Sequence, residues 1–204
     1  MTKGEIRAHF IALLNRRDCS NALADAFFDQ ALTRIKRILR IPSMERQDRY
    51  DVTSADGVSS LFIPSDFLEL IDIYYDGVAL VRIPLHEMIA NQKTGEVGSP
   101  RFFCREQGQF KLHPQPTSGI VYLNYYAEPI ELVNDTDSNT LTVIGSDLVT
   151  YTALSYASDY FLDERAEVFE GRSGQFLSEI QEQANSAEQS GTSQVMRPTH
   201  RYED

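Results

Sequence analysis

The feature that most constrains the fold is a long helical stretch without charge. Residues 146–162 read SDLVTYTALSYASDYFL, and no charged side chain occurs from Leu148 to Ser158. Its apolar and small residues fall on nearly every side of a helix, and such a helix needs neighbours on more than one flank. In a chain with a net charge of −11, this pattern predicts contact with partner copies of the same protein. The residues expected to pack within and between subunits are Leu148, Tyr151, Ala153, Leu154, Ala157, Tyr160 and Phe161.

Two amphipathic helices are predicted in residues 1–46. Apolar residues recur at helical spacing in both, and the second pattern stops before Ile41-Pro42, where a proline cannot continue a helix. Ser20 or Asn21 is the expected N-cap of the second helix. The two apolar stripes are formed by Ile6, Phe10, Leu13 and Leu14, and by Leu23, Phe27, Ala31, Ile35 and Ile38.

The end of the second helix carries a basic cluster. Cations near a helix C-terminus interact favourably with the helix dipole, so one interpretation is a solvated face with this benefit. The alternative is docking onto an acidic neighbour. Residues 1–46 hold 9 basic and 5 acidic side chains, whereas residues 146–204 hold 4 basic and 11 acidic ones, so the sequence permits both interpretations. The cluster consists of Arg34, Lys36, Arg37 and Arg40.

Residues 47–145 lose the helical period and predict an antiparallel β-meander. Asp76-Gly77 and Gln107-Gly108 each separate two apolar stretches, a pattern typical of hairpin turns. Residues 120–127 predict a further strand, residues 85–93 a brief helix and residues 65–69 a short helical turn.

The predicted fold class is therefore α+β. Residues 1–46 and 146–184 are expected to form a helical bundle core, with residues 47–145 as a β-rich insertion. The last helix is expected to turn Val168, Phe169, Phe176, Leu177, Ile180 and Ala184 inward. Residues 185–204 are too polar to fold alone and predict an extended tail that is flexible until bound, with Val195, Met196 and Tyr202 as its few anchors.

Motifs for catalysis and metal binding are weak. Residues 135–139 imitate the first half of an EF-hand loop, but Thr140 stands where the loop requires glycine and Ser146 where it requires glutamate, so a polar turn is predicted instead. The four histidines lack the spacing of a zinc site. No cofactor or metal and no enzyme activity is expected. The neighbouring acids Glu164 and Glu167 leave a hydrolase as the alternative.

Charge and hydropathy restrict the partners. An acidic chain repels phosphate, so sequence-specific DNA binding is not expected, although DNA could pass as a neighbour. No run of 18 apolar residues is present, so no membrane span is expected. Two distant cysteines, Cys19 and Cys104, indicate reduced thiols more readily than a disulfide.

The order of several segments resembles that of a known family. The segments are IPSDFLELIDIYYDG, GSPRFF, KLHPQP, VYLNYYAEPIEL, DSNTL and LVTYTALSYASDYFLDE. Together they resemble the adaptor family of tailed bacteriophages, the head-to-tail connector proteins that are called tail accessory factors in short-tailed phages. The resemblance spans nearly the whole chain, and only the polar tail after Ala184 departs from it.

This resemblance implies a structural protein of the virion, assembled in the host cytoplasm and placed at the junction of capsid vertex and tail. It implies a homododecameric ring beneath the portal protein that extends the DNA ejection channel and attaches tail proteins (nozzle, stopper or tail hub). By analogy, Val195, Met196, Arg197 and Tyr202 would bind the portal or a tail segment. Two alternatives remain open: a stopper or tail-completion protein in the same connector, and a virion-associated cell-wall hydrolase.

Overall fold

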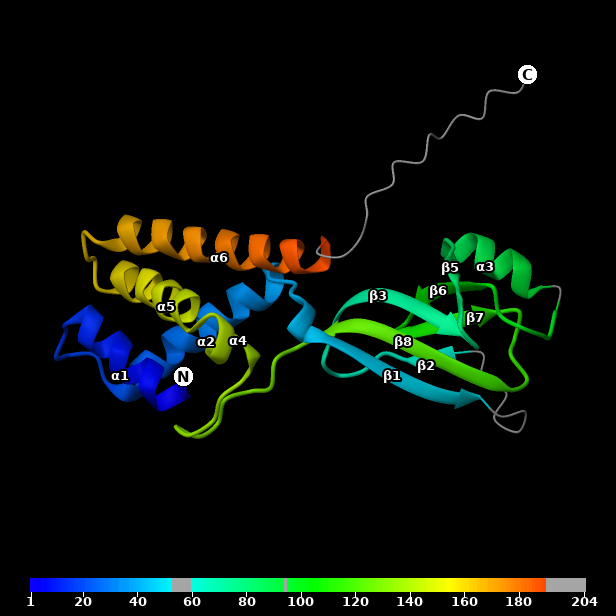
Figure 1. Cartoon of the computed structure of the whole chain (residues 1–204), viewed down its shortest axis with the longest axis horizontal. Helices are drawn as coiled ribbons and strands as arrows, with labels where there is room; N and C mark the ends of the chain where they lie inside the picture. Colours follow the sequence, from blue (N-terminus) through cyan, green and yellow to red (C-terminus); the bar gives the residue numbers. More distant parts are fainter. Residues whose placement is uncertain (53–59, 94, 190–204) are drawn as a thin grey trace, which may run out of the picture. The chain divides into compact units, whose positions relative to one another are not determined.

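A computed structural model describes residues 1–52, 60–93 and 95–189 of the chain. Within these residues the chain forms two compact units, one from residues 1–42 and those from 132 onward, the other from residues 43–131. The first unit is helical and the second contains the strands (Figure 1). The predicted α+β class, with helices from both ends of the chain and mainly antiparallel sheets between them, is confirmed.

The helical unit is built around one central helix. Its elements are α1 (Lys3–Leu14), α2 (Asn21–Ile38), α4 (Thr140–Ile144), α5 (Ser146–Tyr160) and α6 (Ala166–Gln189). Helix α5 contacts α1, α2, α4 and α6. The neighbours that its uncharged surface requires therefore include four helices of its own chain.

Local capping fixes the ends of the first two helices. The hydroxyl of Thr2 accepts from the backbone N–H of Glu5 at 3.3 Å, and the Glu5 carboxylate accepts from the N–H of Thr2 at 2.9 Å. This reciprocal pair is a capping box. Ser20, rather than Asn21, caps α2, because its hydroxyl accepts from the N–H of Leu23 at 3.2 Å. Helix α2 therefore begins where the sequence pattern predicts.

Side-chain contacts set the direction of each helix in the bundle. Thr152 of α5 and Ser173 of α6 share a buried hydrogen bond of 2.7 Å between their hydroxyls. The ring of Phe27, in the first half of α2, lies 5.7 Å from that of Tyr160 at the end of α5. Helices α2 and α6 therefore start beside the end of α5 and run against it, as Figure 1 shows. Fully buried alanines, among them Ala24, Ala31, Ala153 and Ala157, line the helix contacts.

Helix α6 differs from its prediction in two respects. It continues to Gln189, so residues 185–189 are helical rather than part of the polar tail. Val168 is 54% exposed and does not face inward, whereas Phe169 and Ala184 are buried as predicted. Glycines at 171 and 174 interrupt neither the hydrogen bonding nor the length of the helix.

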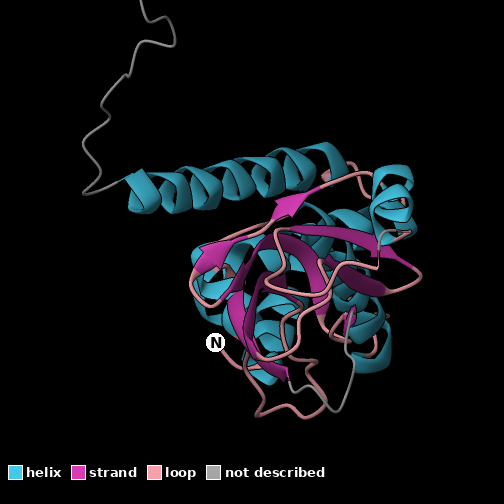
Figure 2. Cartoon of the chain, turned by 90° about the vertical axis from the view of Figure 1, so that its right-hand side faces the viewer, coloured by secondary structure: helices cyan, strands magenta, loops and turns pink. Residues whose placement is uncertain are grey.

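In its described residues, the β unit contains two four-stranded sheets and one α-helix. One sheet has the order β1-β8-β3-β4, and the other has the order β2-β7-β6-β5. Figure 2 shows the strands in magenta. A short 3₁₀ helix, η1 (Pro42–Met44), precedes them. The elements are β1 (Glu45–Val52), β2 (Ser60–Phe62), β3 (Phe67–Tyr75), β4 (Val78–Ala79), β5 (Val81–Arg82), α3 (Leu85–Gln92), β6 (Phe102–Glu106), β7 (Gln109–His113) and β8 (Gly119–Ala127).

Both predicted hairpin turns are confirmed. Asp76-Gly77 joins β3 to β4 with φ values of 45° and 83°, and Gln107-Gly108 joins β6 to β7 with φ values of 47° and 75°. Positive φ at both central residues is the turn geometry that matches the twist of the strands. Between named strands of the described ranges, only β5 and β6 pair in parallel.

The two sheets share one apolar core, which both sheets line with buried side chains. Tyr125 of β8 is buried there, and Phe67 stacks on its ring at 5.6 Å between centroids. Tyr122 and Tyr126 lie half-buried on the opposite face of the strand. The main members of the core are Leu61, Ile73, Tyr75, Phe103, Phe110, Leu112, Val121, Leu123 and Tyr125.

Two local expectations in this unit fail. The predicted helical turn at residues 65–69 is wrong, because β3 begins at Phe67 and pairs with Ala127 of β8. Strand β1 was not predicted, since its sequence ERQDRYDV has little apolar alternation. Eight residues of β1 nevertheless pair in register with β8, from Glu45 opposite Tyr126 to Val52 opposite Gly119.

Candidate interaction surfaces

The residues predicted to pack subunits together are mostly buried inside the chain. Tyr151 and Phe161 are half-buried, and Tyr151 packs against the rings of Phe169 and Phe176. Tyr160 remains 63% exposed. The most exposed residue of the predicted set therefore lies at the C-terminal end of α5. The fully buried members of the set are Leu148, Ala153, Leu154 and Ala157.

An exposed apolar knob lies where α5 turns into α6. We call Tyr160, Leu162 and Val168 the α5–α6 knob; their exposed fractions are 63%, 90% and 54%. Leu162 adopts a positive φ of 53°. A left-handed residue after a helix is usually glycine, so nothing in the sequence marked this leucine as the residue that ends α5 at positive φ. Sequence reasoning found Tyr160 but missed the other two.

The turn that carries the knob is held by backbone hydrogen bonds. The N–H of Leu162 donates to Asp159 O at 3.2 Å, and the N–H of Asp163 donates to Ser158 O at 2.8 Å. The N–H of Phe161 continues the helical pattern to Ala157 O at 2.9 Å. The knob is therefore preformed in the single chain.

Two arginines brace the same turn. Arg165 binds the Asp163 carboxylate at 2.6 Å and donates to Leu14 O, at the end of α1, at 3.0 Å. The guanidinium of Arg16 lies 4.4 Å from the ring centroid of Phe161, a cation–π contact. The hydrogen bonds from Arg165 hold the pKa of Asp163 at about 2. Asp163 therefore stays ionised and serves to fix the turn.

The predicted basic cluster separates into internal and external members. The two terminal guanidinium nitrogens of Arg34 bind the Glu170 carboxylate of α6, Nη1 at 2.9 Å. Arg40 donates to the carbonyls of Lys36 and Leu39, which closes the end of α2. Arg37 is exposed. Arg34 and Arg40 thus act inside the chain, whereas Arg37 faces outward.

Glu170 joins three helices. Besides its ion pair with Arg34 of α2, it accepts from the Ser155 hydroxyl of α5 at 2.7 Å. These bonds, first the one from Arg34, hold the pKa of Glu170 at about 2. Its role is to connect α2, α5 and α6.

The polar loop that imitates an EF-hand holds the start of α1. The N–H groups of Lys3 and Gly4 donate to the carbonyls of Asp137 and Asp135, both at 2.9 Å. The Asp135 carboxylate binds Arg7 at 2.8 Å, and that of Asp137 accepts from two backbone N–H groups of its own loop. The loop residues therefore satisfy helix donors that would otherwise lack partners. In the described ranges, no three His, Cys, Asp or Glu side chains form a group that could hold a metal ion.

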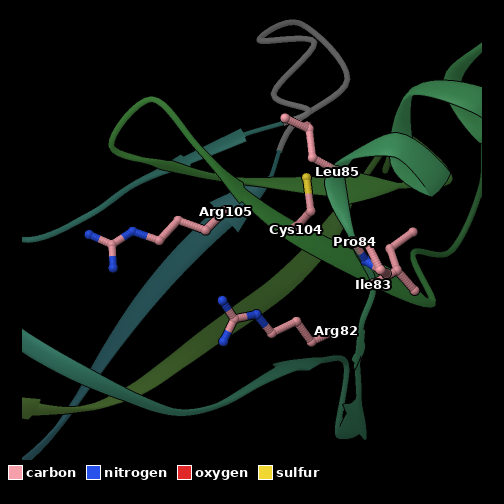
Figure 3. A pocket seen from close by; sticks show the side chains of 6 residues that line it. All are labelled: Arg82, Ile83, Pro84, Leu85, Cys104 and Arg105. Atoms are coloured by element: carbon pink, nitrogen blue, oxygen red, sulfur yellow. The ribbon is translucent and has the colours of Figure 1, made fainter.

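The β unit has a shallow cavity of about 350 Å³ beside α3. Figure 3 shows Arg82 and Arg105 extending to one side of it, with Ile83 and Pro84 on the other. Cys104 also lines it, but burial raises the pKa of this thiol, which disfavours the reactive thiolate. The cavity therefore offers no activated nucleophile.

Comparison with known proteins identifies the family. A family model described as SU10 adaptor protein matches residues 1–201. The chain belongs to the SU10 adaptor protein family. The resemblance to phage head-to-tail adaptors stated from the sequence is thus confirmed. A search of curated proteins gives no match.

Family membership indicates a structural, virion-associated protein. The predicted partner-binding residues of this adaptor, Val195, Met196, Arg197 and Tyr202, lie outside the described residues. In the part of the chain that the structure describes, no helix has both the length and the apolar character of a membrane span.

Proposed function

We propose that this adaptor forms a ring of twelve copies beneath the portal protein of a tailed phage. The ring extends the channel through which DNA leaves the capsid, and it provides the platform on which the tail proteins assemble. The family match carries this proposal, because it covers residues 1–201 and so includes both units of the chain. An alternative place in the same connector is that of a stopper or tail-completion protein.

The charge of the chain supports a channel that DNA passes without being held. The net charge of −11 repels the phosphate backbone. Since DNA must move through the connector, weak contacts with phosphate suit this role better than a basic groove would. No sequence-specific reading of DNA is proposed.

A cell-wall hydrolase finds little support in the helical unit. Glycosidases need one carboxyl group that is protonated at working pH to act as general acid. Asp163 lies beside Glu164 and Glu167, but its pKa is held at about 2 by Arg165. Glu164 and Glu167 are exposed to solvent, and neither lines the cavity beside α3. A clearing assay on peptidoglycan tests this alternative, and clearing lost in Glu164→Gln would favour it.

We further propose that the residues after α6 attach the adaptor to the portal. Val195, Met196 and Tyr202 are the apolar anchors of this segment, and Arg197 adds a cation. We expect these few side chains to make their contacts with the portal when the segment binds it.

The deciding experiment is negative-stain imaging of the adaptor mixed with purified portal, together with a pull-down. Rings seated on one face of the portal are expected. An intact, folded adaptor that fails to bind portal in both measurements contradicts the adaptor function. Imaging of the adaptor alone does not decide the matter, because a subunit can remain monomeric until portal organises the ring.

A further inference from the structure

We propose that the α5–α6 knob docks onto the opposite end of the helical unit of a second copy of this chain. The receiving surface is Arg37 together with Ile38, which we call the basic end patch. Copies would then associate head to tail through their helical units. This inference rests on the proposed ring, for which it names the contact between neighbours.

The conformation of Leu162 is the first support. A non-glycine residue at positive φ is uncommon and strained, and Leu162 has a φ of 53°. Strained residues persist where the surroundings hold them and gather at functional positions. Within its own chain this leucine buries almost nothing, since 90% of it is exposed. A braced, preformed apolar projection of this kind suits docking into a partner.

The charges around the two surfaces indicate that the knob binds a second copy of this chain. Three exposed acids, Asp159, Glu164 and Glu167, flank the knob in the sequence. The exposed Arg165 among them is paired with Asp163, so the balance of charge at the knob is acidic. Arg37 supplies an exposed cation beside Ile38, which is 46% exposed. The knob is apolar and flanked by acids, and the basic end patch is apolar and carries a cation. The two surfaces are therefore complementary in charge, and both belong to this chain. A second copy offers the complement that the knob requires.

The two surfaces lie at opposite ends of one bundle. The knob end contains Phe27, whose ring lies 5.7 Å from that of Tyr160. Ile38 follows Phe27 along α2 by a rise of roughly 16 Å, at about 1.5 Å per residue. A copy cannot reach its own patch over this separation. Contact between two different surfaces is heterologous, and it generates rings where the rotation closes.

Cysteine cross-linking tests this arrangement directly. A chain carrying both Leu162→Cys and Ile38→Cys is oxidised, and its products are separated under denaturing, non-reducing conditions. Head-to-tail contact is expected to give a ladder of dimers, trimers and longer products, whereas either single variant gives dimers at most. The native Cys19 and Cys104 contribute little, because both are buried and burial raises the pKa of each thiol.

Matched substitutions test the two chemical components of the contact. Leu162→Gly should weaken self-association roughly 10- to 100-fold, which corresponds to the loss of one buried leucine side chain. Val143→Ser, at another exposed apolar residue of the same unit that is 66% exposed, is the control and should change nothing. Arg37→Glu should abolish the ladder, and adding Glu164→Arg and Glu167→Arg to the same chain should restore it.

The experiment is run with and without purified portal, so that the two proposals can fail separately. Portal binding without a ladder overturns the knob contact and leaves the adaptor function intact. A ladder without portal binding supports the knob contact and contradicts the adaptor function. Dimers alone in the double-cysteine variant, with portal bound, also overturn the knob contact, because a heterologous interface cannot stop at two.

Discussion

Two arginine–aspartate pairs in the helical unit have the same geometry but different burial. Arg7 of α1 binds Asp25 of α2 through two hydrogen bonds of 2.7 and 2.8 Å. Arg16 binds Asp18 through two of 3.0 and 2.9 Å. The side chain of Arg7 is 11% exposed and that of Arg16 is 38% exposed. Replacing each aspartate by asparagine therefore compares a largely buried pair with an exposed one.

The magnitudes follow from what each substitution leaves behind. Removing one partner of a buried ion pair typically costs 3–5 kcal/mol, because the remaining charge stays buried without its counter-ion. Here Arg7 keeps Asp135 at 2.8 Å, and the Asp25 side chain is itself 29% exposed. We therefore expect Asp25→Asn to lower the free energy of unfolding by about 2 kcal/mol. Asp18→Asn should change it by less than the error of measurement, because water screens an exposed pair.

The assay is urea denaturation followed by far-UV circular dichroism, since the chain contains no tryptophan to report by fluorescence. Both variants are compared with the unmodified chain at pH 7. Arg7→Met combined with Asp25→Leu should be milder than Asp25→Asn, because no buried charge remains. Equal effects of Asp25→Asn and Asp18→Asn would show that burial does not set the strength of these pairs, and the reasoning would fail.

Three further predictions concern other contacts. Glu170→Gln should lower the free energy of unfolding by about 1 kcal/mol at pH 7, after allowance for solvent screening of a half-exposed pair. The folded pKa of Glu170 is lowered from 4.5 to about 2, so the difference between the two proteins should vanish as pH falls through this interval. A difference that is unchanged at pH 2 would contradict the prediction. Thr152→Val should destabilise by about 1–2 kcal/mol by leaving Ser173 without its buried partner, and Ser173→Ala in the same chain should recover part of this loss in the same denaturation assay. Deleting residues 190–204, just beyond α6, should leave the circular dichroism spectrum and unfolding midpoint unchanged but weaken portal binding in a pull-down; unchanged binding would remove the docking role of this segment.

The elements that the sequence predicted well are those with strong local chemistry. Ser20 caps α2 through its own hydroxyl, and Asp76-Gly77 adopts the turn that its residue types favour. Strand β1 could not be predicted in this way. Its residues are polar, and it is a strand because β8 offers a register of eight partners. The false helical turn at residues 65–69 has the same cause, since pairing with β8 outweighs a local capping pattern.

The candidate interaction surface was likewise predicted only in part from the sequence. The sequence placed Tyr160 and Phe161 among the residues along α5 that were expected to pack within and between subunits, and it contained the basic cluster of α2. The sequence could not show that Arg34 forms an ion pair with Glu170 while Arg37 stays exposed. Helical spacing gives the face on which a residue lies but not the neighbour that covers it. The sequence also placed Val168 inward, although α6 turns that side chain to solvent.

The residues of α5 already require that it be covered on several flanks, because a helix without charge from Leu148 to Ser158 cannot expose most of its surface to water. Which elements cover it follows only from the packing of the folded chain. Within the chain α1, α2, α4 and α6 contact this helix, and they leave Tyr160 and the turn beyond it uncovered. The physical reason is that hydrophobicity is non-directional: it requires burial, whereas backbone hydrogen bonds and specific side-chain contacts select the partner.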